Sequence, residues 1–174
     1  MSSYTFEERL AWSEFVAQSD EDLLHILRAR IPGCIRVVRA TLEEDRHGTD
    51  YWAHRAGGLR PLSIDLKARS LDPVETYDRD DVALEIWSVV GERVGWTRDI
   101  RKETDYILWL WTPTRRFFLV PFPALCEVFR RYWATWQDEY ETHIQHSDSW
   151  RSQCVYVPRS VLIGKLNDWM EGAA

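Results

Sequence analysis

Two aspartates and a lysine occur together in a segment that has the pattern of a β-hairpin. The segment 49–69 contains Asp50 and the triplet Asp65-Leu66-Lys67, with Gly57-Gly58 between the two acids. If the chain reverses at the glycines, antiparallel pairs have residue numbers that sum to about 115, so Asp50 stands opposite Asp65 to within a residue or two. Asp65 and Lys67 are two residues apart on one strand, so their side chains project from the same face.

This arrangement predicts a site for a hard divalent cation. Two facing carboxylates are suitable ligands for Mg²⁺ or Mn²⁺, and the ammonium of Lys67 lies where a phosphate or an attacking water would be held. The chemistry that such a set performs is metal-dependent phosphodiester cleavage. The alternative interpretation of the same residues is a surface ladder of ion pairs. The metal site is favoured by its context, because the hairpin brings the two acids together, apolar residues flank the Asp-x-Lys triplet, and Gly48-Thr49 precedes Asp50. Lysine is also rare in this chain, occurring only at 67, 102 and 165.

The bulk composition limits the class of protein. A chain of 174 residues with 45% hydrophobic content suits one compact domain. No apolar run is long enough to cross a bilayer, and three widely spaced cysteines favour reduced thiols, so we expect a cytoplasmic protein without a membrane partner. The net charge of −6 argues against a protein that coats nucleic acid non-specifically, but it leaves a nuclease open because acidic metal ligands lower the total.

The elements that position the acids are predicted from periodicity and turn residues. Two helices are expected at the N-terminus, within 1–31, then a core at 35–140 and a strand with a helix at 150–174. This order predicts an α/β or α+β fold with helices packed on a mixed sheet. In chain order the pattern predicts helices at 5–17 and 19–31, a strand at 35–41, a charged turn at 43–48, the two hairpin strands, strands at 82–90, 106–111 and 117–120, a helix at 121–140, a strand at 154–157 and a helix at 160–170.

This layout, with an acid early in the second strand and Asp-x-Lys in the third, resembles the PD-(D/E)xK nuclease superfamily. In its motif sequence it is most similar to small phage or prophage members. In the order of its first elements it is similar to archaeal Holliday-junction resolvases. The specific part is Gly48-Thr49-Asp50 with Ile64-Asp65-Leu66-Lys67, although no proline precedes Asp50. The resemblance implies one restriction-endonuclease-like domain over 1–174, with a mixed central sheet flanked by helices.

The resemblance also implies roles for individual residues. Asp50 and Asp65 match the two motif acids that hold Mg²⁺ or Mn²⁺, and Lys67 matches the catalytic lysine. Many members add a glutamate from the first helix, for which Glu14 and Glu21 remain alternatives. The implied activity is hydrolysis of a nucleic-acid phosphodiester, with DNA as the expected substrate. A homodimer would suit cleavage of two strands.

Further residues are candidates on their own chemistry. Glu85 interrupts an apolar strand and becomes a third metal ligand if that strand lies next to the strand of Asp65; otherwise it is a structural carboxylate with a partner. His143 and His146 have metal-ligand spacing on an expected helix, but without two further ligands zinc is not expected. The candidates for nucleic-acid contact are His54, Arg69, Arg98, Arg101 and Lys102, against the alternative of a solvated charged surface.

A second class of function remains open. The chain could retain the nuclease fold as a non-enzymatic module that binds a protein partner, for example in conflict between phage and host. The acidic total and the ten tryptophans favour this alternative. The intact set of Asp50, Asp65 and Lys67 favours the enzyme.

Overall fold

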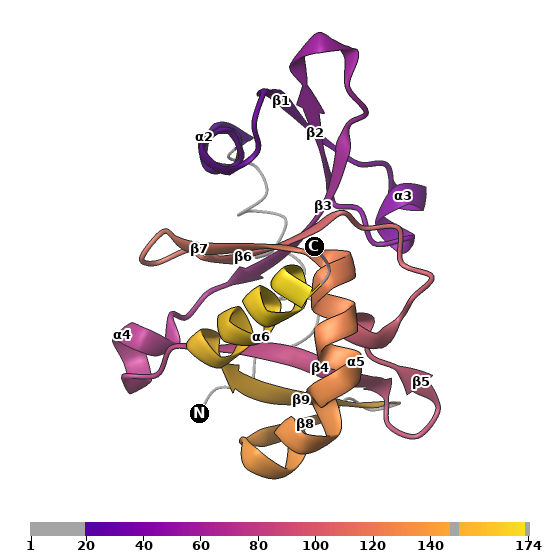
Figure 1. Ribbon diagram of the computed structural model, residues 1–174, viewed down its shortest axis with the longest axis vertical. Coiled ribbons are helices and arrows are strands. Elements are labelled where there is room, and N and C mark those ends of the chain that lie inside the picture. The colour runs from indigo at the N-terminus through magenta and orange to yellow at the C-terminus, as the bar shows by residue number, and fades with distance from the viewer. Residues whose placement is uncertain (1–19, 147–149, 173–174) are drawn as a thin grey trace. The chain divides into compact units, whose positions relative to one another are not determined.

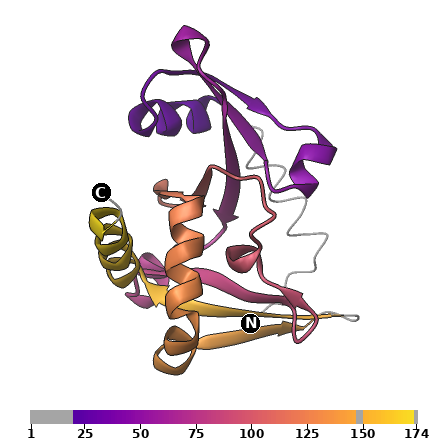
Figure 2. The same ribbon diagram turned by 45° about the vertical axis from the view of Figure 1, so that its right-hand side comes forward.

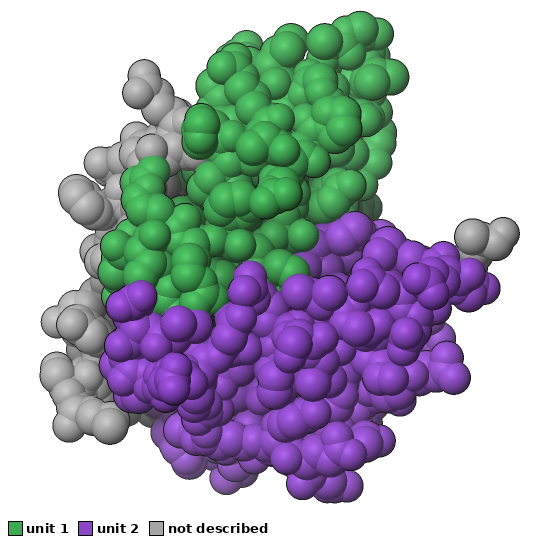
Figure 3. All heavy atoms as spheres, turned by 60° about the vertical axis from the view of Figure 1, so that its left-hand side comes forward, with its two compact units in different colours: residues 1–72, 103–119 green, residues 73–102, 120–174 purple. Residues whose placement is uncertain are grey.

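The computed structural model describes residues 20–146 and 150–172, apart from the side chains at 20–22. The chain forms two compact units, shown in different colours in Figure 3. The first comprises residues 1–72 and 103–119, and the second comprises 73–102 and 120–174. The chain therefore leaves the first unit at Pro73 and returns to it at Glu103. The single domain expected from the sequence stays a prediction.

The first unit is built on a five-stranded mixed sheet with the order β1-β2-β3-β6-β7. Both β1 and β3 are antiparallel to β2, whereas β6 is parallel to β3. Because β3 has a neighbour on each side, its residues are fixed from both edges. The strands, visible in Figure 1, are β1 (Cys34–Arg39), β2 (Tyr51–Arg55), β3 (Leu62–Arg69), β6 (Tyr106–Trp111) and β7 (Arg116–Pro121).

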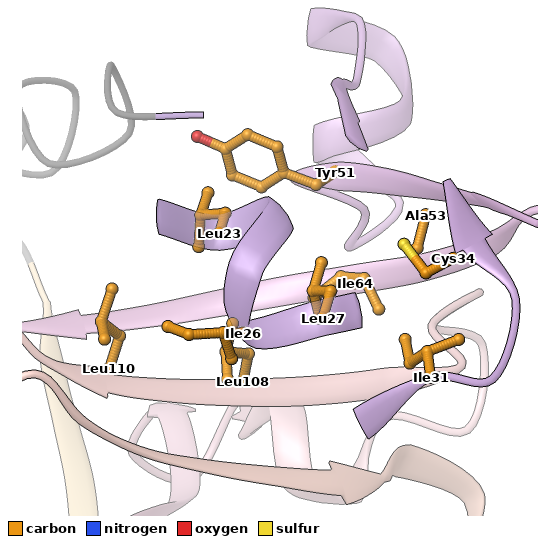
Figure 4. Packing of buried hydrophobic residues seen from close by; sticks show 10 residues of the cluster. All are labelled: Leu23, Ile26, Leu27, Ile31, Cys34, Tyr51, Ala53, Ile64, Leu108 and Leu110. Atoms are coloured by element: carbon orange, nitrogen blue, oxygen red, sulfur yellow. The ribbon is translucent and has the colours of Figure 1, made fainter. Parts of the chain in front are cut away.

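Helix α2 (Asp20–Arg30) covers one face of this sheet. Its apolar side chains and those at alternate strand positions form one buried cluster, drawn in Figure 4. On the strands, Tyr51, Ala53 and Ile64 are at most 2% exposed and contribute to this cluster. Since side chains alternate between the faces of a strand, the residues between them point to the opposite face. The helix contributes Leu23, Ile26 and Leu27, and Ile31 follows it.

The second unit has its own four-stranded sheet with the order β5-β4-β9-β8. All its described pairings are antiparallel. Helices α5 (Phe122–Glu139) and α6 (Arg159–Gly172) pack against each other and over this sheet, as Figure 2 shows. The strands are β4 (Asp81–Val89), β5 (Arg93–Val94), β8 (Thr142–His146) and β9 (Arg151–Pro158), with the short helices α4 (Pro73–Tyr77) and η2 (Trp96–Arg98) beside them.

The mixed α/β fold predicted from the sequence is confirmed, with differences at particular elements. The segment 43–48 was predicted as a turn, but Leu42–Arg46 forms helix α3, because Thr41 and Glu44 make a reciprocal capping box. His143 and His146 lie on strand β8 instead of a helix. The predicted helix 5–17 lies outside the described residues. None of the described helices is long and apolar enough to cross a bilayer.

Truncation of Leu27 tests the packing of α2 on the first sheet. This side chain is 1% exposed at the centre of the cluster. We expect Leu27→Ala to lower the free energy of unfolding by about 2–5 kcal/mol, because a cavity replaces the lost contacts. Urea denaturation measures the change. The control His25→Ala, at an exposed position of the same helix, should stay within about 0.5 kcal/mol of wild type.

Candidate functional site

The register between β2 and β3 sets the two acids opposite each other. The observed pairs are Tyr51 with Ile64, Trp52 with Ser63 and Ala53 with Leu62, which continue to Asp50 opposite Asp65. The Asp50 N–H donates to the Ile64 carbonyl at 2.9 Å, so the pairing extends to this end of the strand. The predicted register is therefore confirmed. Tyr51 and Ile64 face α2, which places both aspartates on the opposite face of the sheet.

Lys67 projects from the same face as Asp65. Its Nζ lies 2.6 Å from Asp65 Oδ1, and the Lys67 side chain is 22% exposed, whereas that of Asp65 is 2% exposed. Asp65 is held between β2 and β6, with Ile107 as its partner on β6. The predicted grouping of an amine with the buried acid is thus present, and the amine is the member that reaches solvent.

Asp50 is held by hydrogen bonds to its backbone and side chain. Its carbonyl accepts from the Ala40 N–H at 2.8 Å, and its Oδ2 accepts from the Leu66 N–H at 2.6 Å. Burial, together with the negative charge of Asp65, raises the pKa of Asp50 to about 7. The charge of Lys67 and the Leu66 hydrogen bond lower the pKa but do not cancel these effects. The two carboxylates are therefore close enough to repel each other.

A segment before β6 fixes the chain on the approach to Asp50. The Glu103 N–H donates to the His47 carbonyl at 3.2 Å, and the Thr104 hydroxyl donates to the Gly48 carbonyl at 2.5 Å. The Thr49 hydroxyl in turn donates to the Glu103 carbonyl at 3.3 Å. Residues 47–49 are thereby attached to the chain that leads into β6. This attachment leaves Asp50 little freedom to move away from Asp65.

Asp105 fixes the start of β3 in the same way. Its Oδ2 accepts from the Ser63 N–H at 2.8 Å, and both of its oxygens accept from the Arg60 guanidinium. Burial by itself would raise the pKa of Asp105, but the hydrogen bonds from Arg60 and Ser63 outweigh it and hold the pKa below the ordinary value. This structural role of Asp105 was not predicted from the sequence. No local pattern indicates it, because Ser63 and Asp105 are 42 residues apart.

Of the additional metal ligands predicted from the sequence, only Glu85 has a described side chain, and its strand belongs to the other sheet. Glu14 lies outside the described residues, and Glu21 is in the first turn of α2, where side chains are not described. Glu85 was predicted on condition that its strand neighbours β3, but β4 pairs with β5 and β9. The Glu85 carboxylate instead accepts from the Ser88 hydroxyl at 2.7 Å and the Trp96 N–H at 3.0 Å. The structural alternative for Glu85 is therefore the one observed.

The predicted nucleic-acid contacts divide between the two units. His54 and Arg69 are half-buried on the first sheet, on the same face as the acid pair. The other three belong to the second unit and have contacts within it. The Arg98 guanidinium lies 5.1 Å and 4.3 Å from the ring centroids of Trp87 and Trp133, Arg101 pairs with Asp99, and the Lys102 ammonium is near the Trp96 and Phe122 rings.

Among residues 20–146 and 150–172, no group of three or more histidine, cysteine or acidic side chains is placed to hold a metal ion. Asp50 and Asp65 thus form a pair, with Lys67 as the third polar side chain. Comparisons with protein-family models, curated proteins and solved structures find no match to this chain.

The raised pKa of Asp50 predicts that this acid destabilises the metal-free protein. Its pKa of about 7 exceeds the usual value near 3.8. Between these pH values the folded protein keeps a proton on Asp50 that the unfolded chain has lost, so the free energy of unfolding falls as pH rises. We expect Asp50→Asn to raise the free energy of unfolding on the order of 1–3 kcal/mol at pH 8. The gain should vanish towards pH 4. Urea denaturation in EDTA at the two pH values measures it.

Asp105→Asn serves as a control, because we expect it to change the free energy of unfolding in the opposite direction. The pKa of Asp105 is lowered, so its stabilisation is present above the ordinary carboxyl pKa and is lost as pH falls through the lowered value. The variant should be less stable than wild type at pH 8. If Asp50→Asn were also less stable at pH 8, the repulsion between Asp50 and Asp65 would not be the dominant effect.

Proposed function

We propose that the first unit carries the catalytic centre of a divalent-metal-dependent nuclease that hydrolyses phosphodiester bonds in DNA. The observation that carries the proposal is the placement of Asp50 opposite Asp65, with Lys67 beside them on one face of the sheet. The order of three strands, with an acid before the second and Asp-x-Lys on the third, supports a restriction-endonuclease-like fold of the PD-(D/E)xK kind. Cys34, Cys126 and Cys154 form no disulfide bond, which is compatible with a cytoplasmic setting.

The acid pair suits a hard dication. Like charges on Asp50 and Asp65 raise the pKa of Asp50, and a bound dication would replace this repulsion by attraction to both carboxylates. Asp50 and Asp65 are the residues that would hold Mg²⁺ or Mn²⁺. When bound, such a metal neutralises phosphate charge and lowers the pKa of a water molecule.

The protein side chains have separate tasks in this proposal. The Leu66 N–H orients the Asp50 carboxylate, so the ligand direction is set before substrate binds. Lys67 is exposed enough to donate a hydrogen bond to a phosphate oxygen or to the attacking water, and its charge opposes the negative charge that grows during hydrolysis. Because β3 is an interior strand, the acid and the amine keep their relative positions.

Two observations favour the alternative of a non-enzymatic module that binds a protein. The described acid pair lacks a third ligating side chain, and Lys67 pairs directly with Asp65. In that reading the three residues are a polar cluster in a scaffold, and divalent metal has no effect on the protein. Cleavage and metal binding separate the two candidates.

Loss of Lys67 tests the catalytic role. We expect wild type with Mn²⁺ to cleave plasmid or oligonucleotide DNA, and Lys67→Ala to lower the rate about 10²–10³-fold, because a charge that stabilises the transition state is removed. Gel assays of initial rate measure the loss. The matched control is Lys165→Ala, which removes a lysine paired with Asp168 on α6 and should cleave like wild type. Equal rates for both variants would contradict the role of Lys67.

Metal binding gives a second test that needs no activity. Mn²⁺ at about 100 times its dissociation constant should stabilise the folded protein by about 2.7 kcal/mol, measured as a rise in melting temperature. Asp65→Asn should abolish the rise, whereas Asp168→Asn, which changes an exposed acid on α6, should keep it. If neither Mn²⁺ nor Mg²⁺ changes the melting temperature of the wild type, the non-enzymatic module that binds a protein becomes the better explanation.

A further inference from the structure

A second pair of side chains lies on the same sheet face as the acids. Arg36 on β1 pairs with His54 on β2, next to the pair Val37 and Ala53. Val37 and Ala53 pack against the cluster under α2, so Arg36 and His54 point to the opposite face. Asp50 is on that opposite face too. The acid pair and the Arg36–His54 pair therefore share one surface of the first unit.

The distance along β2 sets the spacing between these two pairs. Asp50, Trp52 and His54 occupy alternate positions, and four residues of strand span about 13 Å at about 3.3 Å per residue. Trp52 lies between the pairs, where its indole N–H donates to Glu44 Oε1 at 3.0 Å. This span equals roughly four nucleotide steps along the axis of B-form DNA, at about 3.4 Å per step.

The Arg36 side chain lacks the polar partners that several other arginines of the first unit have. Arg28 donates to the Ile35 carbonyl, Arg55 to the Arg60 carbonyl, Arg60 to Asp105, and Arg116 to Asp72. The Arg36 side chain is exposed, and its guanidinium makes no hydrogen bond or ion pair with the described residues. Its guanidinium thus keeps its donors for a ligand from outside the chain.

We propose that Arg36 and His54 form a phosphate-binding subsite that holds a polynucleotide backbone about 13 Å from the acid pair. This inference rests on the proposed nuclease function and adds a direction and a minimum length to its substrate. The guanidinium matches phosphate oxygens with two parallel hydrogen bonds, and the imidazole supplies a further N–H donor in either protonation state. An extended anion fits better than a mononucleotide, because only an extended anion reaches both pairs at once.

The salt dependence of binding tests this subsite. Binding of labelled 20-mers, as duplex DNA, single-stranded DNA and duplex RNA, is measured by fluorescence anisotropy in Ca²⁺ over a series of salt concentrations. We expect Arg36→Ala to weaken binding about tenfold at low salt. The slope of log affinity against log salt should fall by about 0.9 for duplex DNA or about 0.7 for single strands. Comparison among the three probes identifies the preferred nucleic acid.

Two further variants make the result specific. Arg39→Ala is the matched control, because Arg39 is an exposed arginine on the same strand. It pairs with Tyr51 and so belongs to the α2 face. It should bind like wild type. Arg36→Lys keeps the charge and should retain the salt slope, which separates loss of a phosphate contact from loss of folding.

The possible outcomes distinguish the subsite from the nuclease proposal. If wild type cleaves DNA but Arg36→Ala binds like Arg39→Ala, the subsite is wrong and the proposed nuclease stands. If wild type neither binds any of the three nucleic acids nor cleaves with Mn²⁺, both proposals fail. If Arg36→Ala loses affinity only for poly-glutamate, the surface serves an acidic protein partner and the subsite is overturned.

Discussion

The pairing of β2 with β3 is the constraint on which the first unit depends. It places Tyr51, Ala53 and Ile64 in the core under α2, and the same alternation sends Asp50 and Asp65 to the other face. A slip of one residue would turn Asp65 into the apolar core and expose Ile64, at a cost far above that of two facing carboxylates. Hydrophobic burial therefore enforces a register that electrostatics alone would oppose.

The repulsion within the acid pair is offset locally but not removed. Lys67 neutralises Asp65, and the Leu66 N–H supports the charge on Asp50, yet the pKa of Asp50 remains raised. The acids cannot relax by separating, because β3 is bonded on both sides and the residues before β2 are attached to the segment 103–105. The charge repulsion is thus maintained by long-range hydrogen bonds that hold the two acids in place.

Local sequence patterns were sufficient to predict the β2–β3 hairpin, but they did not predict the elements and contacts around it. Gly57 and Gly58, with φ of 73° and 69°, mark the reversal, and alternation fixes the register. Helix α3 had a capping signal at Thr41 and Glu44, which the charged composition obscured. The neighbours of Glu85 and the contacts of 103–105 depend on pairings between distant segments, which no local pattern encodes.

A comparison of two acids in the chain supports a binding role for Asp50. Glu85 receives hydrogen bonds from Ser88 and Trp96, which is sufficient reason for a carboxylate at that position. The Asp50 carboxylate accepts a hydrogen bond from the Leu66 N–H, which the amide oxygen of asparagine would accept equally well. Asparagine would also avoid the repulsion from Asp65. A structural role accounts for the shape of the residue, but Lys67 offsets only part of the cost of its charge, and the proposed cation would offset the rest.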